Sequence, residues 1–86
     1  GNNDFEQAQI TVYPNPVKDN VTLNLSQMNE KVEQLSVFDI TGKMIDSFDV
    51  DNQDRFEMNI GNYASGLYIL KLQTETGQLQ HKLIKE

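Results

Sequence analysis

The sequence predicts an all-β fold, an antiparallel β-sandwich of about seven short strands. Apolar residues alternate with polar ones along most of the 86-residue chain, and this period of two places one side of each strand in a core and the other in water. Turn residues separate the alternating stretches at the short spacing that is typical of sandwiches. The expected strands lie around residues 10–12, 21–25, 35–37, 43–50, 56–60, 67–72 and 79–83.

Turn signals lie between these segments. Pro14-Asn15-Pro16 must redirect the chain between the first two strands, because each proline fixes φ and removes a backbone donor. Thr41-Gly42 predicts a hairpin, since glycine tolerates positive φ. The other predicted turns contain Asp19-Asn20, Gly61-Asn62, Ser65-Gly66 and Thr76-Gly77.

Two segments are richer in apolar residues than simple alternation requires. Residues 43–50 include Met44, Ile45 and Phe48, and residues 67–72 are almost continuously apolar. Runs that are apolar on both faces are typical of central strands that are covered on both sides. Residues 27–34 have a weak helical pattern, and we expect a loop with one turn at most there.

A tyrosine pattern favours an immunoglobulin-like topology for this sandwich. Gly66 precedes Tyr68 by two residues at the start of the most apolar segment. Many immunoglobulin-like domains have a tyrosine corner at this place, in which the hydroxyl group bonds back to upstream backbone. The alternative is that Tyr68 is an ordinary core aromatic.

Length and composition limit the classes of function. Eighty-six residues form a single domain with a modest core, and the absence of cysteine excludes disulfides and thiolate metal sites. The formal net charge of −6 argues against a nucleic-acid partner. No run approaches the roughly 18 apolar residues of a membrane helix, so no membrane span is expected. Residues 1–70 hold eleven acidic and four basic side chains, whereas residues 71–86 hold two acidic and three basic ones.

The first eight residues differ in their sequence pattern from the rest of the chain. Residues 1–8 are polar and lack periodicity, which predicts a linker from an upstream cargo domain, and the folded domain is expected at residues 9–86. No basic-then-apolar signal peptide opens the sequence. We therefore interpret the chain as the end of a larger protein.

Candidate catalytic and metal-binding residues are few. His81 is the only histidine, and its parity matches Leu79 and Leu83 in an alternating strand, so a structural role is favoured over a catalytic one. With one histidine and no cysteine, a zinc site is not expected. Residues 49–54 are acidic but lack the glycine and the closing glutamate that an EF-hand loop requires. We expect neither an enzyme nor a bound cofactor or metal.

Three segments together resemble the type A C-terminal sorting domain of the type IX secretion system of Bacteroidota. The first joins Val12-Tyr13-Pro14-Asn15-Pro16 to the strand at residues 21–25, and the second is the hairpin at residues 37–45. The third begins with Tyr63-Ala64-Ser65-Gly66-Leu67-Tyr68 and leads into residues 80–86. Each segment is a weak signal alone, but their order over residues 10–86 is specific. The motif residues that we expect to serve the fold are Tyr13, Pro14, Asn15, Pro16, Asp39, Gly42, Gly66 and Tyr68.

The resemblance implies a delivery role. Such domains direct a cargo protein from the periplasm through an outer-membrane translocon, and a sortase then removes the domain, so that the cargo stays on the outer-membrane surface or is secreted. The cut is expected near residues 1–9. The sorting signal is expected in the last strand, at Gly77, Gln78, Leu79, Gln80, His81, Lys82, Leu83, Ile84, Lys85 and Glu86.

A physical mechanism for reading this strand follows from its expected place at the edge of a sheet. An edge strand exposes unpaired N–H and C=O groups to which a partner's sheet can add. Lys82 and Lys85 would discourage random pairing and could meet an acidic receptor surface. The oligomeric state is left open, because a free edge can also pair with a second copy.

Two other functions stay open at this point. A non-catalytic module that binds carbohydrate or protein, appended to a secreted enzyme, would display an exposed row of aromatic residues on one sheet. Tyr13, Tyr63 and the phenylalanines lie mostly at core parity or in turns, which counts against that module. A structural immunoglobulin-like spacer would be followed by more chain beyond Glu86.

Overall fold

The computed structural model describes residues 10–86, which form seven strands and no helix. The predicted all-β fold is confirmed, whereas the linker assigned to residues 1–8 lies outside the described residues. One strand begins at Val32, inside the stretch with the weak helical pattern, and the rest of that stretch is a loop with a turn. The strands are β1 (Thr11–Tyr13), β2 (Asn20–Asn24), β3 (Val32–Phe38), β4 (Met44–Asp49), β5 (Arg55–Asn59), β6 (Gly66–Thr74) and β7 (Gln78–Lys85).

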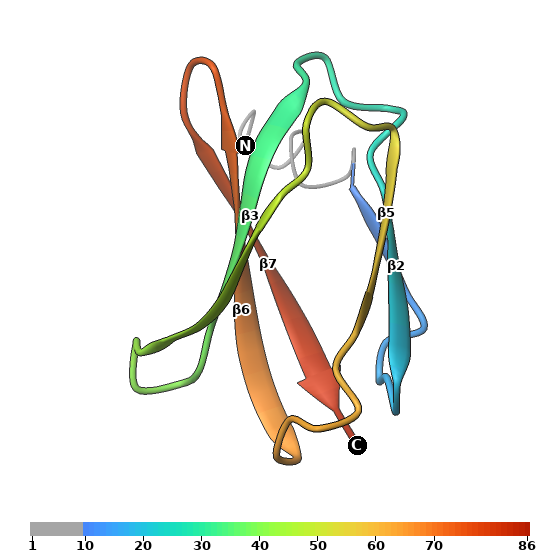
Figure 1. Cartoon of the computed structure of the whole chain (residues 1–86), viewed down its shortest axis with the longest axis vertical. Coiled ribbons are helices and arrows are strands. Elements are labelled where there is room, and N and C mark those ends of the chain that lie inside the picture. Colours follow the sequence, from blue (N-terminus) through green and yellow to red (C-terminus); the bar gives the residue numbers. More distant parts are fainter. Residues whose placement is uncertain (1–9) are drawn as a thin grey trace, which may run out of the picture.

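The strands form two antiparallel sheets that face each other (Figure 1). One sheet has the order β1-β2-β5 and the other has the order β4-β3-β6-β7. The hydroxyl of Tyr68 donates a 2.6 Å hydrogen bond to the backbone oxygen of Ala64, so the tyrosine corner is present at the start of β6. The expectation of an immunoglobulin-like sandwich is therefore confirmed.

The core fills the space between the sheets. Burial alternates along β2 and β6, and Leu23 and Leu70 on these two strands are fully buried. Phe48 of β4 and Phe56 of β5 meet across the sheets with their ring centroids 5.6 Å apart. The fully buried side chains are Leu23, Leu35, Ile60, Leu70, Leu72, Leu83, Val17, Val21, Val32, Val37 and Val50.

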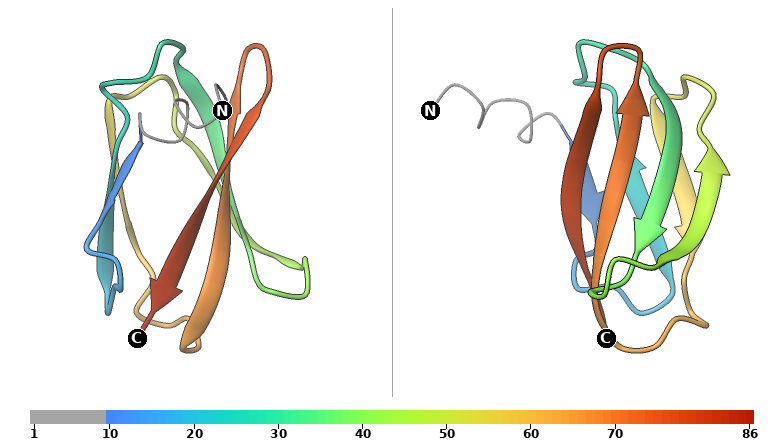
Figure 2. Two further views of the ribbon diagram at one scale, coloured as in Figure 1. Left: turned by 180° about the vertical axis from the view of Figure 1, so that it is seen from behind. Right: turned by 90° about the vertical axis from the view of Figure 1, so that its left-hand side faces the viewer.

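The two segments richest in apolar residues are not covered on both sides, so that expectation was wrong. Residues 43–50 contain β4, which is an edge strand, and β6 is central in its sheet but packs on the core with one face only. Leu67 of β6 is 38% exposed and Met44 of β4 is 52% exposed. The reason is that no second layer of the described chain covers the outer face of the four-stranded sheet (Figure 2). The additional apolar residues therefore contribute to the surface.

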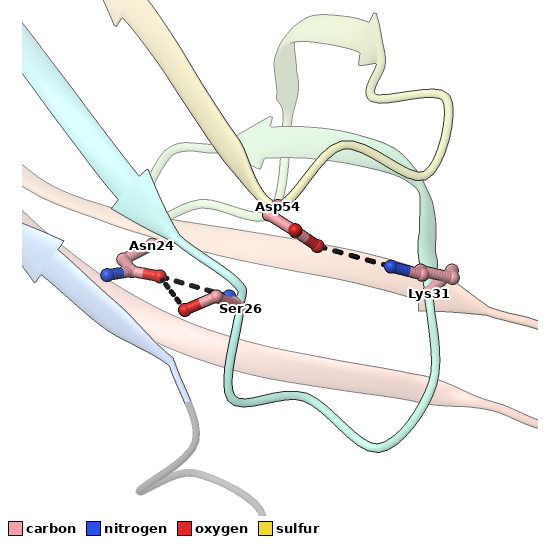
Figure 3. Close-up of polar contacts among 4 residues, drawn as sticks. All are labelled: Asn24, Ser26, Lys31 and Asp54. Atoms are coloured by element: carbon pink, nitrogen blue, oxygen red, sulfur yellow. Dashed lines mark hydrogen bonds and ion pairs between the residues drawn. The ribbon is translucent and has the colours of Figure 1, made fainter.

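Polar side chains hold the end of the sandwich where β2 stops and β5 begins (Figure 3). The Oδ1 atom of Asn24 accepts hydrogen bonds from the backbone N–H of Ser26, at 3.0 Å, and from its hydroxyl, at 2.7 Å. The Nζ atom of Lys31 lies 3.2 Å from Oδ1 of Asp54 and links the β2–β3 loop to the residue before β5. These contacts lie at the end of the sandwich opposite to the end of β7 (Figure 1).

Candidate functional site

The predicted sorting strand is β7, which forms one edge of the four-stranded sheet (Figure 2). It pairs with β6 along its whole length, from Gln78 opposite Gln73 to Lys85 opposite Gly66. Leu83 and Lys85 are buried on the core side. Every second side chain faces away from the core, and these exposed residues are Gln78, Gln80, Lys82 and Ile84.

The β6–β7 hairpin fixes the start of β7. The backbone N–H of the buried Thr74 donates a 2.8 Å hydrogen bond to the backbone oxygen of Gly77. The hydroxyl of Thr76 donates a 2.6 Å bond to Oε2 of Glu30 in the β2–β3 loop, and this bond is the main cause that lowers the pKa of the Glu30 carboxyl. The ionised Glu30 thus ties the hairpin to a neighbouring loop.

The Pro-Asn-Pro loop closes part of the outer edge of β7. We call residues 14–17, which form this contact, the clasp. The Oδ1 atom of Asn15 accepts a 3.0 Å hydrogen bond from the backbone N–H of Ile84, and its Nδ2 atom donates a 3.3 Å bond to the backbone oxygen of Lys82. One amide side chain therefore takes the place of a neighbouring strand, which no local sequence pattern indicated.

The backbone of Val17 continues this pairing. Its N–H donates a 2.8 Å bond to the oxygen of Ile84, and its oxygen accepts a 2.8 Å bond from the N–H of Glu86. These bonds form a parallel bridge between Val17 and Lys85. The clasp therefore occupies the edge of β7 from the oxygen of Lys82 to the N–H of Glu86.

Only the first half of the edge of β7 is open. Alternate residues of an antiparallel strand direct both backbone groups to the same side, so those of Gln78 and Gln80 point outward as those of Ile84 do. No residue in the described part of the chain bonds to these outward groups of Gln78 and Gln80. The edge strand expected from the sequence therefore exposes unpaired backbone groups in its first half, whereas the clasp occupies its second half.

His81 and Lys85 lie on the core side of β7. His81 is half-buried, and its Nδ1 atom lies 2.9 Å from the backbone oxygen of Lys82. Lys85 is 9% exposed and its Nζ atom donates a 2.8 Å hydrogen bond to the oxygen of Glu86. Because its stem packs inside, Lys85 offers little surface to a receptor, contrary to the expectation from the sequence. Lys82 is exposed on the outer face and stays available.

Tyr13, Pro14 and Pro16 lead the chain into and through the clasp. Tyr13 ends β1 opposite Thr22 and is 40% exposed. The Tyr13–Pro14 and Asn15–Pro16 peptide bonds are both cis. β1 pairs in the three-stranded sheet, whereas Val17 pairs with β7 of the other sheet. The motif therefore carries the chain from one sheet to the other, a more specific task than the predicted turn between two strands.

Asp39 organises the β3–β4 turn. Its Oδ1 atom accepts hydrogen bonds from the hydroxyl of Thr41, at 2.6 Å, from the N–H of Thr41, at 2.9 Å, and from the N–H of Lys43, at 3.0 Å. The Thr41 hydroxyl, followed by the Lys43 N–H, holds the pKa of the Asp39 carboxyl below its ordinary value. Gly42 has φ of +90°, which favours glycine, and its N–H closes the turn on the oxygen of Asp39 at 3.0 Å. Both motif residues thus serve the hairpin.

Gly66 and two tyrosines shape the entry to β6. Gly66 has φ of +148°, where other residues are strained, and it permits the bend before Tyr68. The rings of Tyr63 and Tyr68 lie 5.2 Å apart, and the Tyr63 hydroxyl donates a 3.1 Å bond to Oδ2 of Asp46. Burial, followed by the charge of Asp46, raises the pKa of Tyr63. Sequence reasoning missed this contact, because Asp46 lies on β4 and no short-range pattern links the two residues.

Residues 10–86 were also compared with the features of a carbohydrate-binding module, a metal site and a membrane span. Tyr13 is the one aromatic residue among them with an exposed ring, so they display no aromatic row of the kind expected for a carbohydrate-binding module. No three histidine, aspartate or glutamate side chains of this range gather closely enough to hold a metal ion. A search of the same residues finds no helix that is long and apolar enough to cross a membrane.

Comparison with known proteins identifies the family. Residues 11–86 match the family described as the secretion system C-terminal sorting domain. The chain belongs to this family. The resemblance noted in the three sequence segments is therefore confirmed, and a sorting domain of the type IX system implies that system and an upstream cargo that is exported to the cell surface or secreted.

A curated relative contains a segment similar to this domain within a longer chain. The sorting domain is 30% identical over 78 residues to the ulvan lyase NLR42 of Nonlabens ulvanivorans. The match covers 90% of this chain but spans only 14% of the length of the lyase. The similarity thus concerns a short segment of that protein and not the greater part of its chain.

Proposed function

We propose that this domain directs a cargo protein from the periplasm through the outer-membrane translocon of a type IX secretion system, with β7 as the strand that is read. The observation that carries the proposal is the family match over residues 11–86, which includes all of β7. The clasp and the pairing with β6 hold β7 in one position. A folded strand with a fixed outer face is a suitable signal, because a partner meets it without an ordering cost.

The folded domain is assigned to residues 9–86 and the linker to residues 1–8. A surface sortase then cuts near residues 1–9 and releases the cargo or attaches it to the outer-membrane surface. By analogy with the ulvan lyase, the cargo would be a secreted enzyme several times longer than its tail.

A simple truncation of the signal does not test this proposal. Leu83 is fully buried and β7 is the partner of β6, so deletion of residues 77–86 would remove part of the core and one strand of the sheet. Loss of export in such a deletion would not separate the loss of a signal from unfolding. The test must therefore keep the domain folded.

The experiment compares a periplasmic reporter with and without residues 1–86 at its C-terminus, each with an N-terminal signal peptide. Both proteins are produced in a bacterium with a type IX system and in a strain of it that lacks the translocon. We expect the reporter on the surface or in the medium only with the domain and only in the complete strain. A reporter that stays in the periplasm of the complete strain, although the domain is folded, would refute the proposed function.

A further inference from the structure

The outer face of the four-stranded sheet has an apolar end that the fold does not use. Leu67 pairs with Ile84, Ile69 pairs with Phe38, and Phe38 pairs with Met44, so these side chains lie side by side on that face. A shallow hollow of about 340 Å³ continues the patch between Phe38, Ile40, Leu67 and Ile69. The outer patch is therefore defined as Phe38, Ile40, Met44, Leu67, Ile69 and Ile84.

Several apolar side chains of the outer patch are exposed to solvent and so do not contribute to the core. Ile40 is 74% exposed, Met44 is 52% exposed and Ile84 is 47% exposed. Single apolar residues on a surface are ordinary, but a contiguous group with a polar border marks an interaction site in many proteins. Ile84 also belongs to β7, so the patch includes part of the strand assigned to sorting.

Lysines lie beside this patch although the domain as a whole is acidic. Lys82 is the neighbour of Ile69 across the β6–β7 pair, and Lys71 holds its Nζ atom 4.5 Å from the centroid of the Phe38 ring. The ionised carboxylate of Asp39 lies at the border, but the lysines Lys71 and Lys82 outnumber it. The local charge is thus opposite to the net charge of −6 of the chain, which favours an acidic partner.

In the second half of β7, the clasp covers the edge of the strand, so the outer face of the sheet is the side that a partner can reach. The edge from Lys82 to Glu86 already bonds to Asn15 and Val17, so another strand cannot add there without displacing them. The core side of the strand is buried at Leu83 and Lys85. What remains for recognition in this half is the outer face.

We propose that the outer patch is the docking surface through which the sorting domain is read, and that its occupant is a protein surface with apolar side chains flanked by carboxylates. This inference rests on the proposed function and names the chemistry of the partner. Aliphatic side chains at the centre with charged residues around them match the usual anatomy of a protein interface. An anionic membrane is a weaker match, because a chain with net charge −6 is repelled from it.

The test keeps the fold and changes the patch. The reporter fusion is produced with Ile84→Glu, Ile40→Glu or Lys82→Glu, and Ser47→Glu serves as the matched control because Ser47 is exposed on the polar half of the same sheet face. We expect each patch variant to lose about tenfold or more of the exported reporter, equivalent to ~1.4 kcal/mol of binding. The control should stay within about twofold, or ~0.4 kcal/mol. Unfolding midpoints of the purified variants establish that each is folded.

A second pair of variants tests the charge of the partner. Ile84→Lys removes the apolar side chain as Ile84→Glu does, but it adds the charge that an acidic partner prefers. We expect Ile84→Lys to retain more export than Ile84→Glu. Equal losses would overturn the acidic character of the partner.

Other outcomes would overturn the docking surface itself. Normal export of all patch variants, with the unmodified domain exported, refutes the patch and leaves the sorting function intact, whereas failure of the unmodified domain refutes the sorting function first. Binding of the purified chain to vesicles of phosphatidylcholine and phosphatidylglycerol that is lost in Ile84→Glu would identify a membrane as the occupant. A dimer in sedimentation velocity that is lost in the same variant would identify a second copy.

Discussion

The outer faces of the two sheets differ, although their inner faces are equivalent. On the three-stranded sheet, the outward cross-strand pairs of β2 and β5 are polar: Asn20 with Asn59, Thr22 with Glu57, and Asn24 with Arg55. On the four-stranded sheet, one end of the outer face has apolar pairs such as Leu67 with Ile84, whereas the other end has polar pairs such as Lys71 with Gln80. Both faces meet solvent, so the fold alone does not require the difference. Stability explains the inner faces, and the proposed docking would explain the apolar end of one outer face.

The inner faces provide the largest expected effect. Leu23 on β2 and Leu70 on β6 are both fully buried at the centre of their sheets. We expect Leu23→Ala and Leu70→Ala each to lower the free energy of unfolding by about 2–5 kcal/mol, because each leaves a cavity between the sheets. Urea denaturation followed by circular dichroism measures both values.

The corresponding valine variants serve where an alanine variant does not fold. A cost below about 1 kcal/mol for one leucine alone would show that the two inner faces are not equivalent. The outer faces could then no longer be compared on the assumption that the inner faces are equivalent.

The next largest effect on stability is expected at Asn15, because this residue connects the two sheets through the clasp. Asn15→Ala removes two hydrogen bonds to β7, and we expect a cost of about 1 kcal/mol together with faster amide exchange at Ile84. Asn15→Asp keeps the acceptor for the Ile84 N–H and should protect that amide better than alanine does. Hydrogen exchange by NMR measures the amide directly.

The control for the clasp is Asn20→Ala, an exposed asparagine on the three-stranded sheet. It should change stability by no more than about 0.5 kcal/mol. Unchanged exchange at Ile84 in Asn15→Ala would mean that the clasp does not close the edge in solution, and β-strand addition would again be available to a partner.

One cation on each outer face, Arg55 and Lys71, should respond differently to salt. Arg55 lies 3.2 Å from Glu57, and both side chains are more than half exposed, so we expect Arg55→Gln to cost about 0–1 kcal/mol at low salt and less in about 1 M NaCl. Lys71→Gln removes the contact with the half-buried Phe38 ring and should cost about 0.5–1 kcal/mol with less dependence on salt. Urea denaturation at two salt concentrations measures both. Equal salt dependence would remove this distinction between the faces.

The fold was predictable because its signals are local. Period-two alternation located five of the seven strands, richness in apolar residues located the other two, and the Gly66–Tyr68 pattern indicated the tyrosine corner. The turn residues at Gly42 and Gly66 were also correct, since each adopts a positive φ. Such features depend on a few neighbouring residues and are therefore visible in one sequence.

The parts that were missed depend on contacts between distant residues. Asn15 bonds to Ile84, which lies 69 residues later, and Tyr63 bonds to Asp46 on another strand. Lys85 was expected from the sequence to be available to a receptor, and its burial was missed, because a lysine stem can pack inside while its amine bonds locally. Residues 67–72 are rich in apolar residues as the sequence indicated, but only the sheet order shows that some of them lie on the outer face of the sheet.

The smallest expected effect is that of low pH on the β3–β4 turn, which borders the outer patch. The hydroxyl of Thr41, followed by the N–H of Lys43, lowers the pKa of Asp39, so ionised Asp39 stabilises the β3–β4 turn above its ordinary pKa. This contribution is lost as the pH falls through the lowered pKa of the folded state. The melting temperatures of the wild type and of Asp39→Asn should therefore differ at neutral pH and converge once the pH falls below the lowered pKa of folded Asp39. Thr41→Val should raise the pKa of Asp39 in an NMR titration, and an unchanged pKa would mean that the hydroxyl contact does not form. The turn at Asn24 and Ser26 beside the three-stranded sheet has no titrating acceptor, so acid should act on the border of the patch and not on that turn.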